Sequence, residues 1–214
     1  MYRALQRRLG PQRWWPARTR FEVMVGAILT QNTAWHNVER AIANLRRSRA
    51  LSARALADMP PARLARLIRP SGYFTQKAKK LRRFSRWYLK RCGARPSRLF
   101  RGDPLELRAE LLQLWGIGPE TADSILLYAG GRPLAVVDAY TRRILARHGL
   151  LRGDEPYEEI QRRLMRWLPP RAGDYNEHHA LLVEVGKRWC HRRNPACEQC
   201  PLGAFPHRIT AEVR

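Results

Sequence analysis

Four cysteines are the most reactive side chains in this sequence. Cys190, Cys197 and Cys200 crowd into the last 25 residues, whereas Cys92 stands alone. Thiolates gathered in this way can act together as metal ligands. In a protein that we expect to remain in the cytosol, this crowding favours a metal centre over disulfide bonds.

A turn bracketed by glycines precedes an aspartate with catalytic potential. Gly116 and Gly118 enclose Ile117 between the end of one expected helix and the start of the next. Ile117 can anchor the turn in the core, while the surrounding backbone N–H groups form a nest for a phosphate oxygen. Farther along, Asp138 follows the apolar run 134–137 and begins a helix, where a carboxylate either caps the helix or takes part in chemistry.

Helical periodicity dominates the chain and predicts an all-α fold with short links. The run 134–137 is the single β-like segment, and it is too isolated to form a sheet. Pro104 predicts a helix that begins there with Asp103 as its cap. We expect the other helices over Phe21–Leu29, Ala34–Leu45, Leu64–Ile68, Gln76–Leu89, Asp123–Tyr128, Ala139–His148, Tyr157–Trp167 and Glu177–Trp189.

The charge balance predicts a polyanionic partner. The chain has 41 Lys and Arg against 18 Asp and Glu, a formal net charge of +23. A solvated surface or an arginine-rich genome explains part of this excess, but such a charge favours salt-sensitive binding to phosphates. No apolar run approaches the ~20 residues of a membrane span. The N-terminus lacks the apolar core of a signal peptide, so we expect a cytoplasmic protein that contacts no membrane.

The turn, the aspartate and the cysteines together resemble the helix–hairpin–helix/Gly-Pro-Asp DNA glycosylase superfamily, in its endonuclease III branch. The residues that carry the resemblance are Leu114–Ala122, which contain Gly-Ile-Gly, and Val136-Val137-Asp138. The resemblance extends from Phe21 to about Cys200. It implies an all-α base-excision repair glycosylase with two helical lobes. The first, a six-helix barrel-like lobe, spans residues 21–133 and carries the hairpin at 111–130; the second combines residues 1–20 with 134–214 and ends in an iron–sulfur loop at 190–207.

The resemblance also implies roles in DNA binding and catalysis. Gly116, Ile117, Gly118 and Thr121 would bind the DNA backbone, and Asp138 would be the catalytic carboxylate at the cleft between the lobes. Breaking an N-glycosidic bond builds positive charge on the sugar. A carboxylate near the anomeric carbon can stabilise that charge or deprotonate a water.

One family position differs in a way that bears on the reaction. Bifunctional members carry a lysine that forms a Schiff base, and Glu120 stands at that position here. A carboxylate cannot form a Schiff base, so we predict a monofunctional glycosylase with weak or absent AP lyase activity. Lys187 is an alternative source of an amine, and Glu120 is alternatively a surface residue that stabilises a helix N-terminus.

Tryptophans near the start of the chain predict the pocket for the flipped base. Trp14-Trp15-Pro16, and Trp35 after Leu-Thr-Gln-Asn-Thr, are similar to the bacterial 3-methyladenine DNA glycosylases of the endonuclease III type. The similarity implies that Trp35 stacks on the base, that Trp14, Trp15 and Pro16 line the pocket, and that Glu120 lies at its floor. Positively charged N-alkylated purines suit aromatic faces. Each tryptophan is alternatively a core residue.

The loop before Trp35 resembles the family's wedge, the residue that fills the gap left by the flipped base. Asn32 aligns best with this position and Gln31 is next. Their amides can bind the orphaned partner base. Capping of a helix end is an equally good interpretation of either residue.

The C-terminal cysteines match three ligands of the family's [4Fe–4S] loop. Cys190-x6-Cys197-x2-Cys200 has the family spacing, but the fourth cysteine is replaced by Pro206. His207 is a candidate fourth ligand, because histidine replaces cysteine in some iron–sulfur sites. A cluster with an exchangeable iron, a zinc ion and the absence of any metal are the alternatives.

These observations leave three functions open. The first is a monofunctional alkylpurine glycosylase, and the second is an endonuclease III-like glycosylase and lyase for oxidised pyrimidines. The third is a DNA-binding protein without catalysis. In each case the expected partner is duplex DNA, with a damaged base for the enzymes. We expect a monomer associated with a bacterial-type nucleoid.

Overall fold

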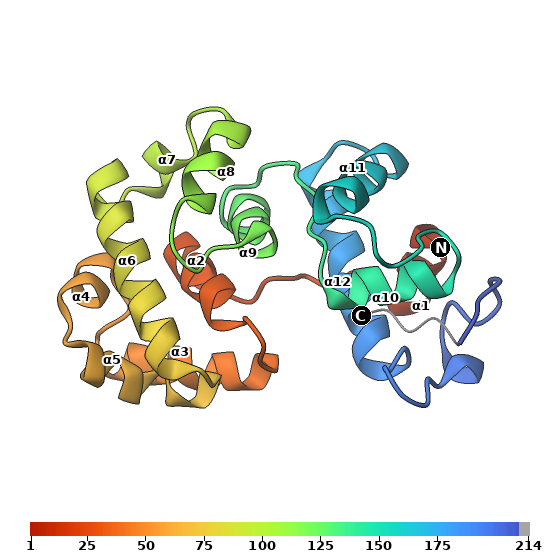
Figure 1. Ribbon diagram of the computed structural model, residues 1–214, viewed down its shortest axis with the longest axis horizontal. Coiled ribbons are helices and arrows are strands. Elements are labelled where there is room, and N and C mark those ends of the chain that lie inside the picture. Colours follow the sequence, from red (N-terminus) through yellow and green to blue (C-terminus); the bar gives the residue numbers. More distant parts are fainter. Residues whose placement is uncertain (210–214) are drawn as a thin grey trace. The chain divides into compact units, whose positions relative to one another are not determined.

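The computed structural model describes residues 1–209, and these form helices and loops without a strand (Figure 1). The predicted all-α fold is therefore confirmed. The chain forms two compact units: unit 1 is Met1–Pro16 with Gly131–Arg214, and unit 2 is Ala17–Gly130. The boundaries predicted between the two lobes lay at residues 20/21 and 133/134, whereas the units meet at 16/17 and 130/131. Residues 210–214 of the predicted second lobe lie outside the described part. No helix of that part has the length and apolarity to cross a membrane.

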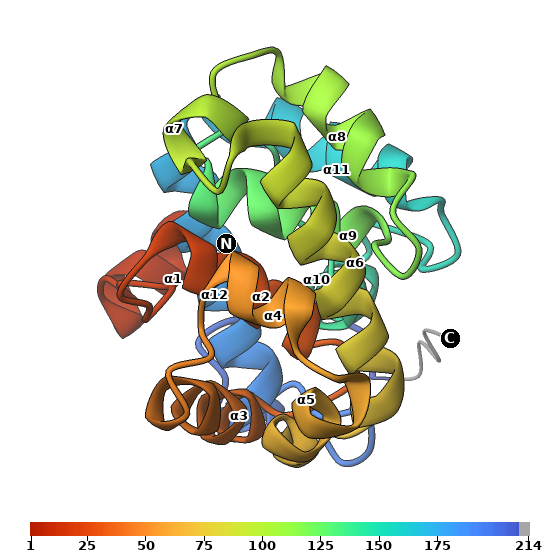
Figure 2. The ribbon, with the colours of Figure 1, turned by 90° about the vertical axis from the view of Figure 1, so that its left-hand side faces the viewer.

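Unit 2 is built around α2 and α6. Every residue of α2 from Glu22 to Leu29 is buried, as expected of a helix surrounded by others. The long α6 packs along α4 and α5 (Figure 2). Leu81, Phe84 and Tyr88 are among its buried residues. The helices are α2 Arg20–Leu29, α3 Trp35–Arg47, α4 Ala53–Asp58, α5 Pro61–Leu67, α6 Phe74–Cys92, α7 Pro96–Leu99, α8 Pro104–Leu112 and α9 Pro119–Ser124.

The helix predicted at Asp123–Tyr128 differs in type. The α-helical part ends at Ser124, and Ile125–Ala129 forms a π-helical turn in which Gly130 N binds Ile125 O at 3.1 Å. Ile125, Leu126 and Leu127 are all buried, so this turn, like α2, is surrounded by other elements of unit 2.

Unit 1 has a core that joins distant parts of the chain. Leu5 of α1 packs with Ile144 of α10, Leu202 of the C-terminal loop, and α12 residues that include Leu182. The sequence did not predict α1, nor α4 and α7 in unit 2, and α12 begins five residues before the expected Glu177. The elements are α1 Tyr2–Leu9, α10 Ala139–Arg147, α11 Tyr157–Trp167, α12 Ala172–Arg188 and a 3₁₀ turn at Cys197–Gln199.

Candidate active site and cysteine pocket

Asp138 is the N-cap of α10 and lies at the end of a buried, extended link. The link residues 134–137 are 3–5% exposed. Gln161 of α11 donates from Nε2 to Ala135 O at 2.6 Å, which satisfies a buried carbonyl of the link. Asp138 Oδ1 accepts the Thr141 N–H at 2.7 Å. Packing against α11 therefore fixes the point where the helix begins and one oxygen of its capping carboxylate.

The second oxygen of Asp138 faces a histidine of α12. His179 Nε2 lies 3.6 Å from Asp138 Oδ2, and the two side chains are 9% and 11% exposed. Burial by itself raises the pKa of Asp138. The electrostatic interaction with His179 and the hydrogen bond from Thr141 outweigh burial, so the pKa lies below its ordinary value. The carboxylate is held ionised in surroundings with little water.

Sequence reasoning missed His179, although a signal was present. His179 is the first of five consecutive buried residues of α12, which continue to Val183, so this part of the helix is packed on several sides. A buried histidine needs a polar partner. Asp138 is that partner, but only the folded structure brings the two elements together.

The turn bracketed by glycines joins α8 to α9 in unit 2. Ile117 is 6% exposed and anchors the turn in the core. Gly116 has a φ of +86°, and a Cβ there would lie 2.5–2.7 Å from side-chain carbons of Lys80. Gly118 has a φ of −96°, and its Cβ would meet no described atom within 4 Å. The fold thus requires glycine at position 116 but not at 118, where a missing side chain leaves the backbone open to a ligand.

Gln31 ties the end of α2 to this turn. Its Nε2 donates to Gly116 O at 3.0 Å and to Thr121 Oγ1 at 2.9 Å, and its Oε1 accepts a hydrogen bond from Lys80. Thr121 is buried. Asn32 is exposed in the loop after α2, with a φ of +51°. The two wedge candidates therefore differ, because the Gln31 amide already has partners within unit 2.

The expected pocket residues are distributed over both units. In unit 1, Trp14 and Trp15 are half-buried and pack edge to face with ring centroids 5.8 Å apart, and Pro16 is exposed. Lys187 Nζ lies 5.1 Å from the centroid of the Trp14 ring. The ring face of Trp14 thus already accommodates a cation.

Two further candidates begin helices of unit 2. Trp35 is the first residue of α3 and is half-buried. Glu120 is exposed in the first turn of α9, directly after Pro119, where a carboxylate interacts favourably with the helix dipole.

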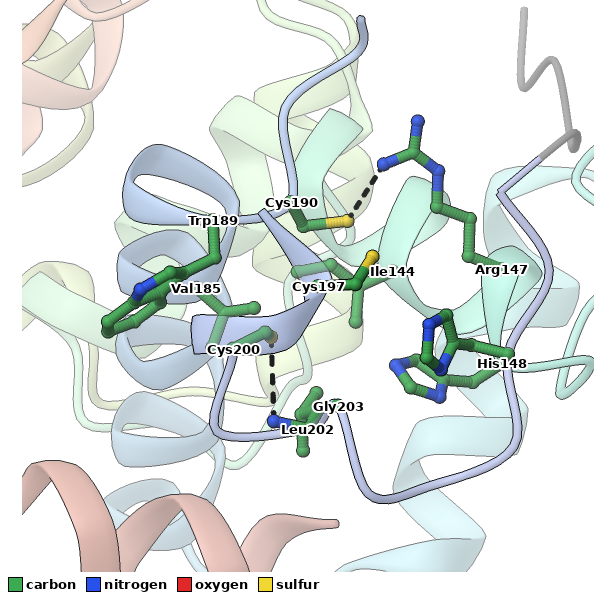
Figure 3. Close-up of a pocket in the computed structure, with 11 residues that line it drawn as sticks. Ile144, Arg147, His148, Val185, Trp189, Cys190, Cys197, Cys200, Leu202 and Gly203 are labelled. Carbon is green, nitrogen blue, oxygen red and sulfur yellow. Dashed lines mark hydrogen bonds between the residues drawn. The ribbon is translucent and has the colours of Figure 1, made fainter. Parts of the chain in front are cut away.

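The three C-terminal cysteines line one pocket in unit 1 (Figure 3). Burial raises the pKa of Cys200, and the nearby thiols of Cys190 and Cys197 add to that rise. Ile144, among other apolar residues, forms part of the wall. Cys92 belongs to unit 2, where its Sγ lies 3.1 Å from Tyr88 O. Among the described residues, no three His, Cys, Asp or Glu side chains converge closely enough to hold a single metal ion.

A buried arginine faces the pocket. Arg147, the last residue of α10, donates from Nη1 to Cys190 Sγ at 3.2 Å and to His191 O at 2.7 Å. Its Nε is buried and has no hydrogen-bond partner in the described part of the chain. A buried cation with an unsatisfied donor fits a pocket that holds an anionic group. Cys200 Sγ also accepts an N–H, from Leu202 at 3.4 Å.

Two histidines complete the pocket. His207, expected as a ligand, lines it together with His148, which sequence reasoning missed. Their ring centroids are 5.6 Å apart. His148 caps the C-terminus of α10, so a residue far from the cysteines in sequence reaches them through the fold. The sulfurs of Cys190 and Cys197 point toward the side of the pocket from which Arg147 and His148 enter (Figure 3).

Family models match most of the chain. The model of the HhH-GPD superfamily of base excision DNA repair proteins matches residues 25–170. The model of the iron–sulfur binding domain of endonuclease III matches residues 190–205 and therefore covers all three pocket cysteines. Both agree with the resemblance inferred from the hairpin and the cysteine spacing.

Individual proteins are similar over nearly the same length. A protein of Methanocaldococcus jannaschii that carries the name of a DNA repair glycosylase is 44% identical over 210 residues, covering 96% of this chain and 93% of its own. Endonuclease III of Thermotoga maritima is 33% identical, covering 85% of this chain and 80% of its own. The crystal structure of the H. pylori 3-methyladenine DNA glycosylase bound to 1,N6-ethenoadenine is similar with a TM-score of 0.74. It is 30% identical and covers 86% of this chain and 92% of that one.

Proposed function

Because the chain belongs to the HhH-GPD superfamily of base excision DNA repair proteins, we propose that it is a monofunctional DNA glycosylase for alkylated purines such as 3-methyladenine. It acts as a monomer on duplex DNA, turns the damaged base out of the helix and hydrolyses its N-glycosidic bond. The observation that carries this proposal is the buried Asp138 carboxylate, kept ionised by His179 and Thr141.

Asp138 is assigned the catalytic role for a chemical reason. Loss of the base leaves positive charge on the sugar, and a fixed anion in a setting with little water stabilises that charge more strongly than one in bulk solvent. Oδ1 is held by Thr141, and Oδ2 remains on the side of His179. The carboxylate can orient and deprotonate the attacking water, while His179 positions it.

The monofunctional reaction follows from Glu120. At the position where bifunctional relatives attack with an amine, this chain offers a carboxylate, so water is the nucleophile and the DNA strand stays intact. Lys187, whose Nζ lies over the Trp14 ring, remains the alternative amine, and the borohydride trapping described below detects it if it reacts.

DNA binding is assigned to the turn at residues 116–118. Backbone N–H groups beside the open Gly118 can bind a phosphate, with Ile117 as the anchor and Gln31 and Thr121 as internal supports. Since Gln31 is engaged there, we favour Asn32 as the wedge.

Two glycine variants test this assignment. Gly118→Ala adds a methyl group where phosphate binds, and we expect duplex affinity to fall about tenfold with an unchanged melting temperature. Gly116→Ala strains a positive φ and meets Lys80, so we expect it to lose about 1 kcal/mol or more of stability. Full duplex affinity in Gly118→Ala would remove the turn from the binding surface.

Alkylated purines are the proposed substrates because of the aromatic residues. Trp35 stacks on the flipped base, Trp14, Trp15 and Pro16 contribute further pocket surface, and Glu120 supplies a polar group. The cation over Trp14 supports a preference for positively charged bases, since it demonstrates that the ring face accepts one. The H. pylori relative, whose name specifies 3-methyladenine, supports the same choice.

The cysteine pocket suits a [4Fe–4S] cluster. The pocket contains three free thiols, and two N–H groups donate hydrogen bonds to their sulfurs. Together with the unsatisfied Nε of Arg147, these features suit an anionic group bound by thiolates. Ligands of a cluster bind different irons, so they need not converge on one ion. The cluster would be structural, linking the C-terminal loop and its basic residues, such as Arg192 and Arg193, to the core of unit 1.

A substrate assay tests the proposed activity. Purified protein is incubated with duplex DNA carrying 3-methyladenine, thymine glycol or uracil, and free base is measured separately from strand breaks. We expect release of 3-methyladenine, strand breaks only after alkali, and no covalent adduct with borohydride. Release of thymine glycol with a trapped adduct would establish the endonuclease III-like alternative. Tight binding without base release would leave a DNA-binding protein.

A further inference from the structure

The cysteine pocket lacks one thiol for a cluster with four protein ligands. The sequence contains four cysteines, and Cys92 is in unit 2 beside Tyr88. At the family's fourth position stands Pro206, whose side chain has no donor atom. A fourth protein ligand in unit 1 must therefore be another residue type, and imidazole is the known replacement for thiolate in iron–sulfur sites.

The two pocket histidines have a defined tautomer. His148 Nδ1 lies 2.9 Å from Pro206 O, and His207 Nδ1 lies 2.8 Å from Phe205 O. A carbonyl oxygen only accepts, so Nδ1 must carry the proton in both rings. Nε2 then has a free lone pair. A ligand histidine typically shows this arrangement, in which one nitrogen donates to a backbone carbonyl and the other binds metal.

The two histidines differ in how firmly they are held. His148 ends α10, and its hydrogen bond joins residues 58 positions apart. A second bond between the same segments, Arg208 N to Arg147 O at 2.7 Å, holds the loop against the helix end. His207 is exposed and binds a carbonyl two residues away in its own loop. The His148 ring is thus positioned by the core of unit 1, whereas the His207 ring is positioned by the loop alone.

The hydrogen-bond partner of His148 lies at the position of the family's fourth cysteine. Pro206 is the residue at which the family carries its fourth cysteine, and His148 donates to that residue's carbonyl. The imidazole therefore lies beside the backbone position that supplies the missing ligand in relatives. We infer that His148, through Nε2, is the fourth protein ligand of the cluster, together with Cys190, Cys197 and Cys200. This inference rests on the cluster proposed above and replaces His207 as the candidate.

Spectroscopy on intact protein tests the inference. Wild type, His148→Ala, His148→Cys and His207→Ala are purified without oxygen and analysed for iron, acid-labile sulfide and pulsed EPR of the paramagnetic cluster. We expect hyperfine coupling from a directly bound nitrogen in wild type and in His207→Ala. His148→Ala should lose that coupling and part of its iron. His148→Cys should keep the iron, lose the nitrogen coupling and show a lower reduction potential, because thiolate replaces imidazole.

Three results would overturn the inference. Nitrogen coupling that survives in His148→Cys but vanishes in His207→Ala would assign the ligand to His207. A wild-type cluster without nitrogen coupling would exclude histidine altogether. A folded, iron-free wild type after anaerobic purification would exclude the cluster.

Base release is measured on the same samples, so that failure of the cluster inference and failure of the glycosylase proposal can be told apart. Iron-free protein that releases base leaves the glycosylase proposal intact, and cluster-bearing protein that releases none contradicts that proposal alone.

Discussion

Among the helices of the described residues, two are capped by aspartates, one in each unit, and the surroundings of these aspartates differ. Asp103 caps α8, and its Oδ1 accepts the N–H groups of Leu105 at 2.6 Å and Glu106 at 3.1 Å. It is exposed to solvent. Asp138 caps α10 through a single N–H, and its side chain is 11% exposed with His179 at 3.6 Å. The same aspartate cap is therefore exposed to solvent in α8 and largely buried beside a polar partner in α10.

The difference separates capping from chemistry. Asp103 satisfies two helix N–H groups without burial and without a cation, so a cap needs neither. Burying a carboxylate costs free energy unless charges and hydrogen bonds compensate for it. At Asp138 the compensation comes from His179 and Thr141. A buried, partnered anion with more support than a cap requires indicates a functional group.

The largest expected effect distinguishes the two caps by activity. Asn is as good a helix cap as Asp, so Asp138→Asn and Asp103→Asn should both keep their helices. Asp138→Asn removes the negative charge and should slow base release about 10³-fold while DNA binding persists. Asp103→Asn is the matched control and should retain wild-type activity. Single-turnover base release and duplex affinity measure the two effects.

Equal activity in the two variants would reduce Asp138 to a structural cap. A parallel loss in both would indicate that the assay reports helix stability. Only a loss confined to Asp138→Asn, with unchanged melting temperatures, supports the comparison.

A smaller effect is expected from the partner of Asp138. In His179→Gln the electrostatic partner of Asp138 is removed, and the lowering of the Asp138 pKa that depends on it is lost. The Asp138 pKa then rises, so the acid limb of the pH–rate profile should move to higher pH. At neutral pH we expect about a tenfold decrease in kcat with little change in KM, because His179 positions the carboxylate and does not contact the base.

An acid limb at the wild-type position in His179→Gln would show that the histidine does not set the charge state of Asp138. His178→Gln, an adjacent residue of the same helix, is the control and should leave the acid limb in place.

The sequence predicted the parts of the site that depend on local signals. The turn could be recognised because Gly116 and Gly118 interrupt the helical pattern, although only position 116 requires glycine for its conformation. Asp138 could be recognised because an apolar run leads into a helical pattern. The buried Ile117 and the α10 boundary at Ala139 followed from the same patterns.

Contacts between distant segments could not be predicted. Gln31 reaches a carbonyl 85 residues away, and His148 reaches one 58 residues away. Neither carries a local pattern that names its partner, since an amide or imidazole on a helix end suits solvent equally well. α1 was missed for a related reason: Leu5 is its single buried residue, and it is buried only because α10 and α12 cover it.

The smallest expected effect concerns stability at the exposed cap. Asp103→Ala removes the acceptor for two N–H groups and should lower the free energy of unfolding by about 1 kcal/mol, whereas Asp103→Asn should change it by only a few tenths. Urea unfolding of both variants measures this, with base release below the transition as the second readout. Because Asp103 serves α8 alone, the destabilised Asp103→Ala protein should still release base at the wild-type rate wherever it is folded. A proportional loss of activity in the folded protein would mean that the stability of α8 affects the reaction itself and not only DNA binding. The difference between the two aspartates would then lie in the helices that they cap and not in their carboxylates.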